Sequence, residues 1–253
     1  PQSGSFTVAT SYTVTATQTD AQGDVSLPVT QNLIVDSAAP VAPTAANLAT
    51  ASNSGSTLDR ITNVSSPTID VAGLESGASF TVTATRSGTT VTCAGTSSGS
   101  TGSCVLPSLT DGTWSIAVKQ TDLALNDSTT FNASSIQILT SVSAPVISNT
   151  ATLINTTSVS VSFSLVSATA TCSLDGAASS SCSSPFTASS LSEGAHVIVV
   201  TATDIAGNTA SSSYSFTVDS LAPSLPTIST SAQYQTSSTP SIAFSGEATS
   251  TFT

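Results

Sequence analysis

His196 is the only histidine in this 253-residue sequence, and a lone histidine raises the question of general acid or base catalysis. Two further copies of the same sequence phrase carry Tyr12 and Trp114 at this position, each eight residues before an aspartate, as in the His196 copy. If His196 were catalytic, the two copies with Tyr12 or Trp114 at this position would lack the catalytic group. We interpret His196 as a packing residue on the strand face that it shares with Ile198 and Val200.

Other signatures of catalysis are missing from the sequence. It contains no glycine-rich phosphate loop and no pair of histidines spaced for metal binding. We therefore predict no catalytic residue, no cofactor and no enzymatic activity.

The four cysteines fall into two short brackets, Cys93 with Cys104 and Cys172 with Cys182. The two cysteine pairs occupy equivalent positions in two repeats, and their spacing does not fit a zinc ribbon. We predict two local disulfides, which indicate an oxidising compartment, each contributing about 3 kcal/mol in the chain-entropy model. Buried free thiols are the alternative. These cysteines are the only site residues that we assign.

The charge balance excludes some classes of partner. Charged residues make up 7% of the chain, and only Arg60, Arg86 and Lys119 are basic, which gives a net charge of −11. Nucleic-acid binding requires clustered Lys and Arg, so we exclude it. The hydrophobic residues, 38% of the chain, alternate along it and form no run of about 18, which predicts a folded protein without a membrane-inserted segment.

A repeated phrase organises the chain. TATDIAGNTASSSYSFTVDSLAP occupies residues 201–223, an earlier version runs from 15 to 40, and a looser copy runs from 116 to 145. Such repetition indicates an array of similar domains. We expect part of an Ig-like domain in 1–36, complete Ig-like domains in 37–143 and 144–220, and the beginning of another in 221–253.

The strand pattern indicates the fold. Trp114, Ile116 and Val118 alternate with polar or small residues, as in half-buried strands, and no helical period is present. Asp175 and Gly176 form a strong hairpin-turn signal. We predict an all-β protein of tandem immunoglobulin-like antiparallel β-sandwiches joined by short Pro-containing linkers.

Several phrases resemble a known family. Units that open with APxxPT, pass through LTDGTWSIAVKQTD or LSEGAHVIVVTATDIAGN, and end with VDSLAP are similar to the bacterial Ig-like repeat domains of large surface proteins and adhesins. The resemblance covers nearly the whole chain. It implies an extracellular location at the bacterial cell surface and a role in an extended stalk or fibre.

The same resemblance implies calcium binding at acidic loop positions in some members of the family. Calcium requires six to eight oxygen ligands, whereas Asp and Asn in such loops also cap turns. We favour turn capping, keep calcium as the alternative and assign no metal ligand. The matching positions are Asp20 and Asp36 in one copy and Asp204, Asn208 and Asp219 in another, while the middle copy has Asp122, Asn126 and Asp127 but Ser141 in place of the last aspartate.

We predict a structural stalk or fibre segment of a bacterial surface adhesin. Its partners would be neighbouring Ig-like repeats, with a host or surface glycan or protein as a further option. The first alternative is a self-assembling filament or sheath subunit, in which the two partial end domains of identical subunits pair head to tail by strand complementation. A carbohydrate-binding accessory module is a weaker alternative, because Trp114 is expected in the core.

Overall fold

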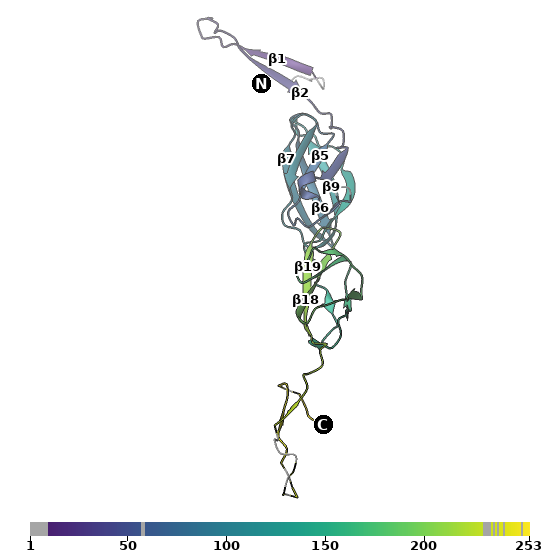
Figure 1. Cartoon of the computed structure of the whole chain (residues 1–253). Helices are drawn as coiled ribbons and strands as arrows, with labels where there is room; N and C mark the ends of the chain where they lie inside the picture. Colours follow the sequence, from purple (N-terminus) through teal and green to yellow (C-terminus); the bar gives the residue numbers. More distant parts are fainter. Residues whose placement is uncertain are drawn as a thin grey trace. The chain divides into compact units, whose positions relative to one another are not determined.

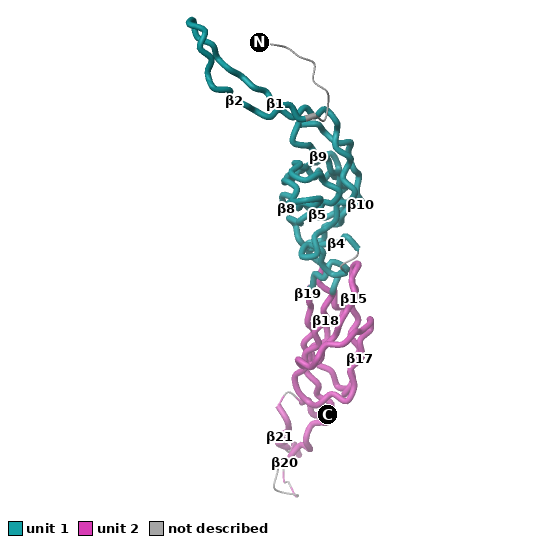
Figure 2. Tube along the Cα trace, turned by 90° about the horizontal axis from the view of Figure 1, so that it is seen from above, with its two compact units in different colours: residues 1–142, 203–209 teal, residues 143–202, 210–253 magenta. Residues whose placement is uncertain are grey.

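The computed structural model describes residues 10–56, 59–229, 234, 236, 238–239, 241–248 and 250–253. Parts of the expected partial domains 1–36 and 221–253 lie outside these residues. The chain divides into unit 1, residues 1–142 with 203–209, and unit 2, residues 143–202 with 210–253 (Figure 2). Among the described residues, no helix is long and apolar enough to cross a membrane.

Unit 1 contains a two-sheet sandwich (Figure 1). One sheet has the strand order β4-β10-β9-β6-β7 and the other has the order β3-β5-β8, and a short 3-10 helix, η1 (Thr50–Ser52), follows β3. The strands are β3 (Ala45–Leu48), β4 (Ile61–Thr62), β5 (Thr68–Ala72), β6 (Ser79–Arg86), β7 (Thr89–Thr96), β8 (Thr101–Val105), β9 (Gly112–Thr121) and β10 (Phe131–Ile138).

The core of this sandwich consists of alternate residues from both sheets. Phe80 and Val82 of β6 face Ile69 of β5 within one buried cluster, to which β9 adds Trp114 and Ile116. Trp114 is 3% exposed, and its indole Nε1–H donates to the Thr110 carbonyl at 2.9 Å. The alternation seen in the sequence is therefore confirmed by the burial of these side chains.

Unit 1 also includes the hairpin of β1 (Thr10–Ala16) and β2 (Val29–Val35). Val14 and Ala16 alternate with threonines, a pattern that predicts a half-buried strand, but this prediction is wrong, because Val14 is 47% exposed and Ala16 is exposed as well. A single two-stranded hairpin has no second sheet to cover its apolar side chains.

Unit 2 repeats the five-stranded sheet with the order β12-β19-β18-β15-β16, but its remaining strands form separate pairs, β11-β14, β13-β17 and β20-β21. Its buried cluster includes Val161, Ile198, Val200 and Phe216. The strands are β11 (Val146–Ile147), β12 (Leu153–Ile154), β13 (Val159–Val161), β14 (Phe163–Ser164), β15 (Thr169–Leu174), β16 (Ser180–Ser181), β17 (Phe186–Ala188), β18 (Gly194–Thr203), β19 (Thr209–Val218), β20 (Thr227–Ile228) and β21 (Phe244–Ser245).

The hairpin signal in unit 2 is confirmed. Asp175 and Gly176 follow β15 with φ angles of 51° and 75°, and the Ala177 N–H donates to the Leu174 carbonyl at 2.9 Å. Two successive residues with positive φ match the right-handed twist of the flanking strands. The turn brings Asp175 to the start of β18, where its main-chain N–H donates to the Val197 carbonyl.

Candidate functional site

The acidic turns between β9 and β10 and between β18 and β19 have the same construction. The Asp122 carboxylate accepts the main-chain N–H groups of Ala124 and Asn126, both at 2.8 Å, and the Asn126 side-chain amide at 2.9 Å. The Asn126 amide is the main cause that lowers the pKa of Asp122. Asp204 accepts the main-chain and side-chain N–H groups of Asn208 in the same way, at 2.9 and 2.8 Å.

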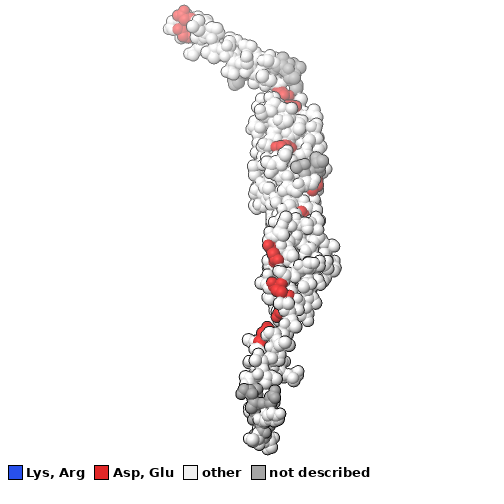
Figure 3. All heavy atoms as spheres, viewed as in Figure 1, with Lys and Arg blue, Asp and Glu red and all other residues white. Residues whose placement is uncertain are grey.

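These carboxylates therefore cap turns, as the sequence indicated. Within the described ranges, no three or more His, Cys, Asp or Glu side chains gather in a geometry that could hold a metal ion. Acidic residues lie scattered over the face shown in Figure 3, separated by uncharged surface. Of the positions considered for calcium, Asp20, Asp36, Asp122 and Asp204 have carboxylates that already accept main-chain N–H groups.

His196 has two oxygen partners. Its Nδ1 lies 2.7 Å from Asp175 Oδ2, and its Nε2 lies 2.9 Å from the Ser192 carbonyl oxygen. The ring stacks on Phe216 with 5.6 Å between centroids, and its side chain is 7% exposed. The hydrogen bond that the ring donates to Asp175 is the main cause that raises the pKa of His196, and the same bond is the main cause that lowers the pKa of Asp175.

The chemistry of this group follows from its acceptors. Because both partners of the ring are proton-free oxygens, both ring nitrogens donate only when the imidazole is protonated. The Ser192 hydroxyl lies 3.5 Å from Nε2, farther than the Ser192 carbonyl oxygen, which Nε2 meets at 2.9 Å. The arrangement of Ser, His and Asp therefore fastens the β15–β16 turn to β18. Sequence reasoning placed His196 in the packing but missed Asp175, although the hairpin signal marked its position.

A pair of parallel strands recurs in both units. In unit 1, the short strand β4 pairs with the last strand, β10, through Gln137 N–H to the Arg60 carbonyl at 3.0 Å and Leu139 N–H to the Thr62 carbonyl at 2.9 Å. In unit 2, β12 pairs in parallel with β19 by two equivalent main-chain bonds, from Thr217 to Thr152 and from Asp219 to Ile154, at 2.8 and 2.9 Å.

Arg60 reinforces the parallel pair of unit 1. The β9–β10 register shifts between Ala133 and Ile136, and the carbonyls of Ser134 and Ser135 within this shift accept Arg60 Nη2 at 2.6 Å and Nε at 3.1 Å. Arg60 also donates to Asn47 Oδ1 at 2.6 Å on β3. Burial lowers the pKa of Arg60, which remains a cation. This single side chain thus joins strands from both sheets.

Gln120 is a buried polar residue whose hydrogen-bond partners the sequence pattern did not reveal. It is fully buried on β9, where its Nε2 donates to the carbonyls of Val41, at 2.6 Å, and Gly73, at 3.2 Å. Its Oε1 accepts the Glu75 N–H at 2.8 Å. The Gln120 amide thus connects the segment that enters the sandwich to the end of β5. In the sequence, only the alternation of β9 indicated that the Gln120 side chain points inward.

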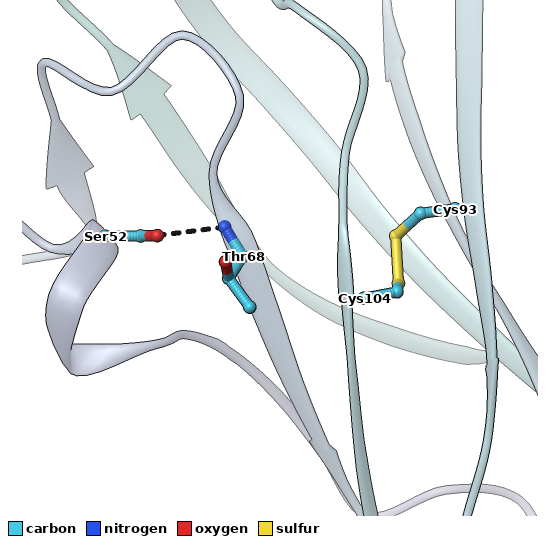
Figure 4. The surroundings of a disulfide bond; sticks show 4 residues. All are labelled: Ser52, Thr68, Cys93 and Cys104. Atoms are coloured by element: carbon cyan, nitrogen blue, oxygen red, sulfur yellow. Dashed lines mark hydrogen bonds between the residues drawn. A yellow bond between two sulfur atoms is a disulfide. The ribbon is translucent and has the colours of Figure 1, made fainter.

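Two disulfides add covalent links. Cys93 on β7 is bonded to Cys104 on β8 and so joins the two sheets of the first sandwich, near the Ser52 hydroxyl that accepts the Thr68 N–H at 2.9 Å (Figure 4). Cys172 on β15 is bonded to Cys182, just after β16. The described part of the chain has no free cysteine.

Several solved structures align with this chain at low sequence identity. The fibronectin domains FN1–FN3 of chicken CNTN1 align with 15% identity over 83% of this chain and 76% of theirs, with a TM-score of 0.36. A Ca²⁺-stabilized adhesin that helps an Antarctic bacterium reach out and bind ice aligns with 20% identity over 83% of this chain and 57% of its own, with a TM-score of 0.42. A 1.5-MDa bacterial ice-binding adhesin aligns with 20% identity over 81% and 73%, with a TM-score of 0.40.

The sequence matches no curated protein. The sequence model of the bacterial Ig-like domain matches twice, at residues 40–138 and 132–220, which together cover more than half of the chain. The protein therefore belongs to the bacterial Ig-like domain family, with two tandem copies of the domain.

Proposed function

We propose that this chain is a non-enzymatic, load-bearing segment of an extracellular stalk in a bacterial surface adhesin. The recurrence of the parallel strand pair in both units carries the proposal. Each pair joins a strand near the beginning of a sandwich to its last strand. A force that pulls the ends of a sandwich apart moves two parallel neighbours in opposite directions. All hydrogen bonds between them then bear the load together instead of opening one at a time.

The other fastenings support a mechanical role. Arg60 fixes β10 to β3 beside the parallel pair, and the Cys93–Cys104 disulfide keeps a segment of the chain closed even after unfolding. Tandem bacterial Ig-like domains are an architecture that suits a spacer at the cell surface, with neighbouring repeats as partners.

Single-molecule force spectroscopy tests this proposal. The intact chain should show a distinct high-force unfolding event for each sandwich. Arg60→Met should lower the force of one event. Arg86→Met should not, because among the described residues the Arg86 side chain bonds only to the Thr110 hydroxyl. Extension at low force without separate events would contradict the load-bearing role.

Reduction provides an internal measure in the same experiment. The Cys93–Cys104 link spans a sequence separation of 11, which at about 3.6 Å per residue corresponds to about 40 Å of hidden length. In a variant with Cys172 and Cys182 replaced by alanine, reductant opens only this link and should lengthen the event that Arg60→Met weakens by about this amount. If the lengthened event is a different one, the assignment of Arg60 to the loaded sandwich is wrong.

A self-assembling filament subunit is a second candidate, which one observation favours. Val29 and Ile34 on the β1–β2 hairpin are both 71% exposed, and an uncovered apolar hairpin recruits further strands. Electron microscopy and sedimentation of the purified chain separate the candidates: regular filaments support assembly, and discrete particles support the stalk segment. We do not propose a carbohydrate-binding module, because the Trp114 ring is buried and cannot stack on a sugar.

A further inference from the structure

The turn between β18 and β19 belongs to unit 1, although both strands lie mainly in unit 2. Residues 203–209 group with residues 1–142 by their contacts, and Figure 2 shows them in the colour of unit 1. The turn contains Asp204, Ala206 and Asn208 of the repeated phrase. Unit 1 thus includes a turn that comes from the following repeat.

Three contacts hold this turn within unit 1. The Ser54 hydroxyl donates to the Ala206 carbonyl at 2.7 Å, and Asn208 Nδ2 donates to the Leu139 carbonyl at 2.7 Å. Gly55 lies against the turn so closely that a Cβ on it would be 2.1 Å from the Ile205 carbonyl oxygen. These contacts involve neutral groups, and the Asp204 carboxylate is directed to Asn208 within the turn itself.

The equivalent turn in the first sandwich shows what this docking changes. Asp122 and Asn126 make the same internal bonds as Asp204 and Asn208, yet Ala124 is exposed, whereas its counterpart Ala206 is 0% exposed. The internal geometry of the turn therefore does not bury this alanine. Its burial comes from the surface that receives the turn.

The asparagine contact also occurs twice. Asn126 Nδ2 donates to the Asp36 carbonyl at 3.2 Å, and Asp36 is the first residue after β2, as Leu139 is the first after β10. In each case the asparagine of a turn binds the carbonyl where the preceding hairpin ends. In the front copy of the phrase, Asp24 occupies this position, and its carboxylate has no N–H to donate.

We propose that the β18–β19 turn is a plug that stabilises the preceding sandwich, and that Ser54, Gly55 and the Leu139 carbonyl form its socket. Through this contact, residues 203–209 raise the stability of the sandwich in unit 1. This stabilisation within unit 1 goes beyond the load-bearing role and would hold in an unloaded chain. The docking of the turn depends on main-chain acceptors and on a close fit at Gly55. A side chain at Gly55 would occupy the position of the turn.

Matched pairs of variants in the full chain test the socket and the plug. Gly55 and Gly99 both have φ of +67°, but a Cβ at Gly99 meets nothing within 4 Å, so Gly99→Ala carries the backbone strain without the clash. Ala206→Leu enlarges the buried alanine, and Ala124→Leu makes the same change in the exposed turn.

Two measurements report on the contact. Hydrogen exchange of the amides in 204–208 reports whether the turn is docked, and fluorescence of Trp114, the only tryptophan, reports unfolding of the first sandwich in urea. Gly55→Ala and Ala206→Leu should each speed the exchange about tenfold and lower the urea midpoint relative to their controls. Equal effects within either pair would overturn the socket, and faster exchange with an unchanged midpoint would overturn the stabilising role.

Discussion

Removing the Cys93–Cys104 disulfide should destabilise the first sandwich by about 3 kcal/mol. The two cysteines are separated by 11 positions, and closing a loop of about a dozen residues reduces the entropy of the unfolded chain by this amount at 25 °C. Replacing both cysteines with alanine keeps their sites apolar, and Cys104 is buried. With a urea dependence of about 1.5 kcal/mol per molar, the midpoint should fall by about 2 M.

Trp114 makes this shift measurable in the complete chain. It is the only tryptophan and is buried in the first sandwich, so its fluorescence follows that sandwich alone. The matched control removes Cys172 and Cys182 of unit 2 and should shift the Trp114 midpoint less than the first variant does. The loop-entropy argument would be refuted by a loss below about 1 kcal/mol, or by equal shifts in the two variants.

Three further predictions concern other parts of the chain. Because the folded state raises the pKa of His196 and lowers that of Asp175, their pairing should stabilise unit 2 fully between about pH 4 and 6.5. This stabilisation should be lost as pH rises through the folded pKa of His196 or falls through the folded pKa of Asp175. Thermal unfolding measured across pH should show that His196→Gln removes the loss of stability at alkaline pH. An unchanged pH profile in this variant would contradict the pairing. Gly102→Ala should cost about 1–3 kcal/mol by urea unfolding, because its Cβ would lie 2.4 Å from the buried Phe80 ring, whereas equal stability would show that the ring moves freely. Calcium or EDTA should leave both unfolding midpoints unchanged if the acidic turns are caps, and a rise with calcium would make them metal sites.

The sequence predicted those parts of the fold that depend on local patterns. Alternation located β9 and the inward side of Trp114, and the pair Asp175 and Gly176 located the β15–β16 turn. It could not predict the parallel pairing of β4, because two residues carry no periodicity and their partner is distant in sequence. The partners of Arg60 and Gln120 were also hidden, since they are main-chain carbonyls that any residue supplies.

The five-stranded sheets of the two units share their strand order but differ in the side chains that hold it in place. Where unit 1 has Arg60 beside its parallel pair, the equivalent residue of unit 2 is Thr152, and where unit 1 buries Gln120, two residues before the capping aspartate, unit 2 has Ala202. The main-chain bonds of the parallel pair are the same in both. The two units therefore share the strand order of this sheet and its parallel pairing, and we expect donors from single side chains to set how strongly each sandwich resists unfolding. Repeats with the same fold would then yield at different loads, so that a stalk built from them would extend one domain at a time.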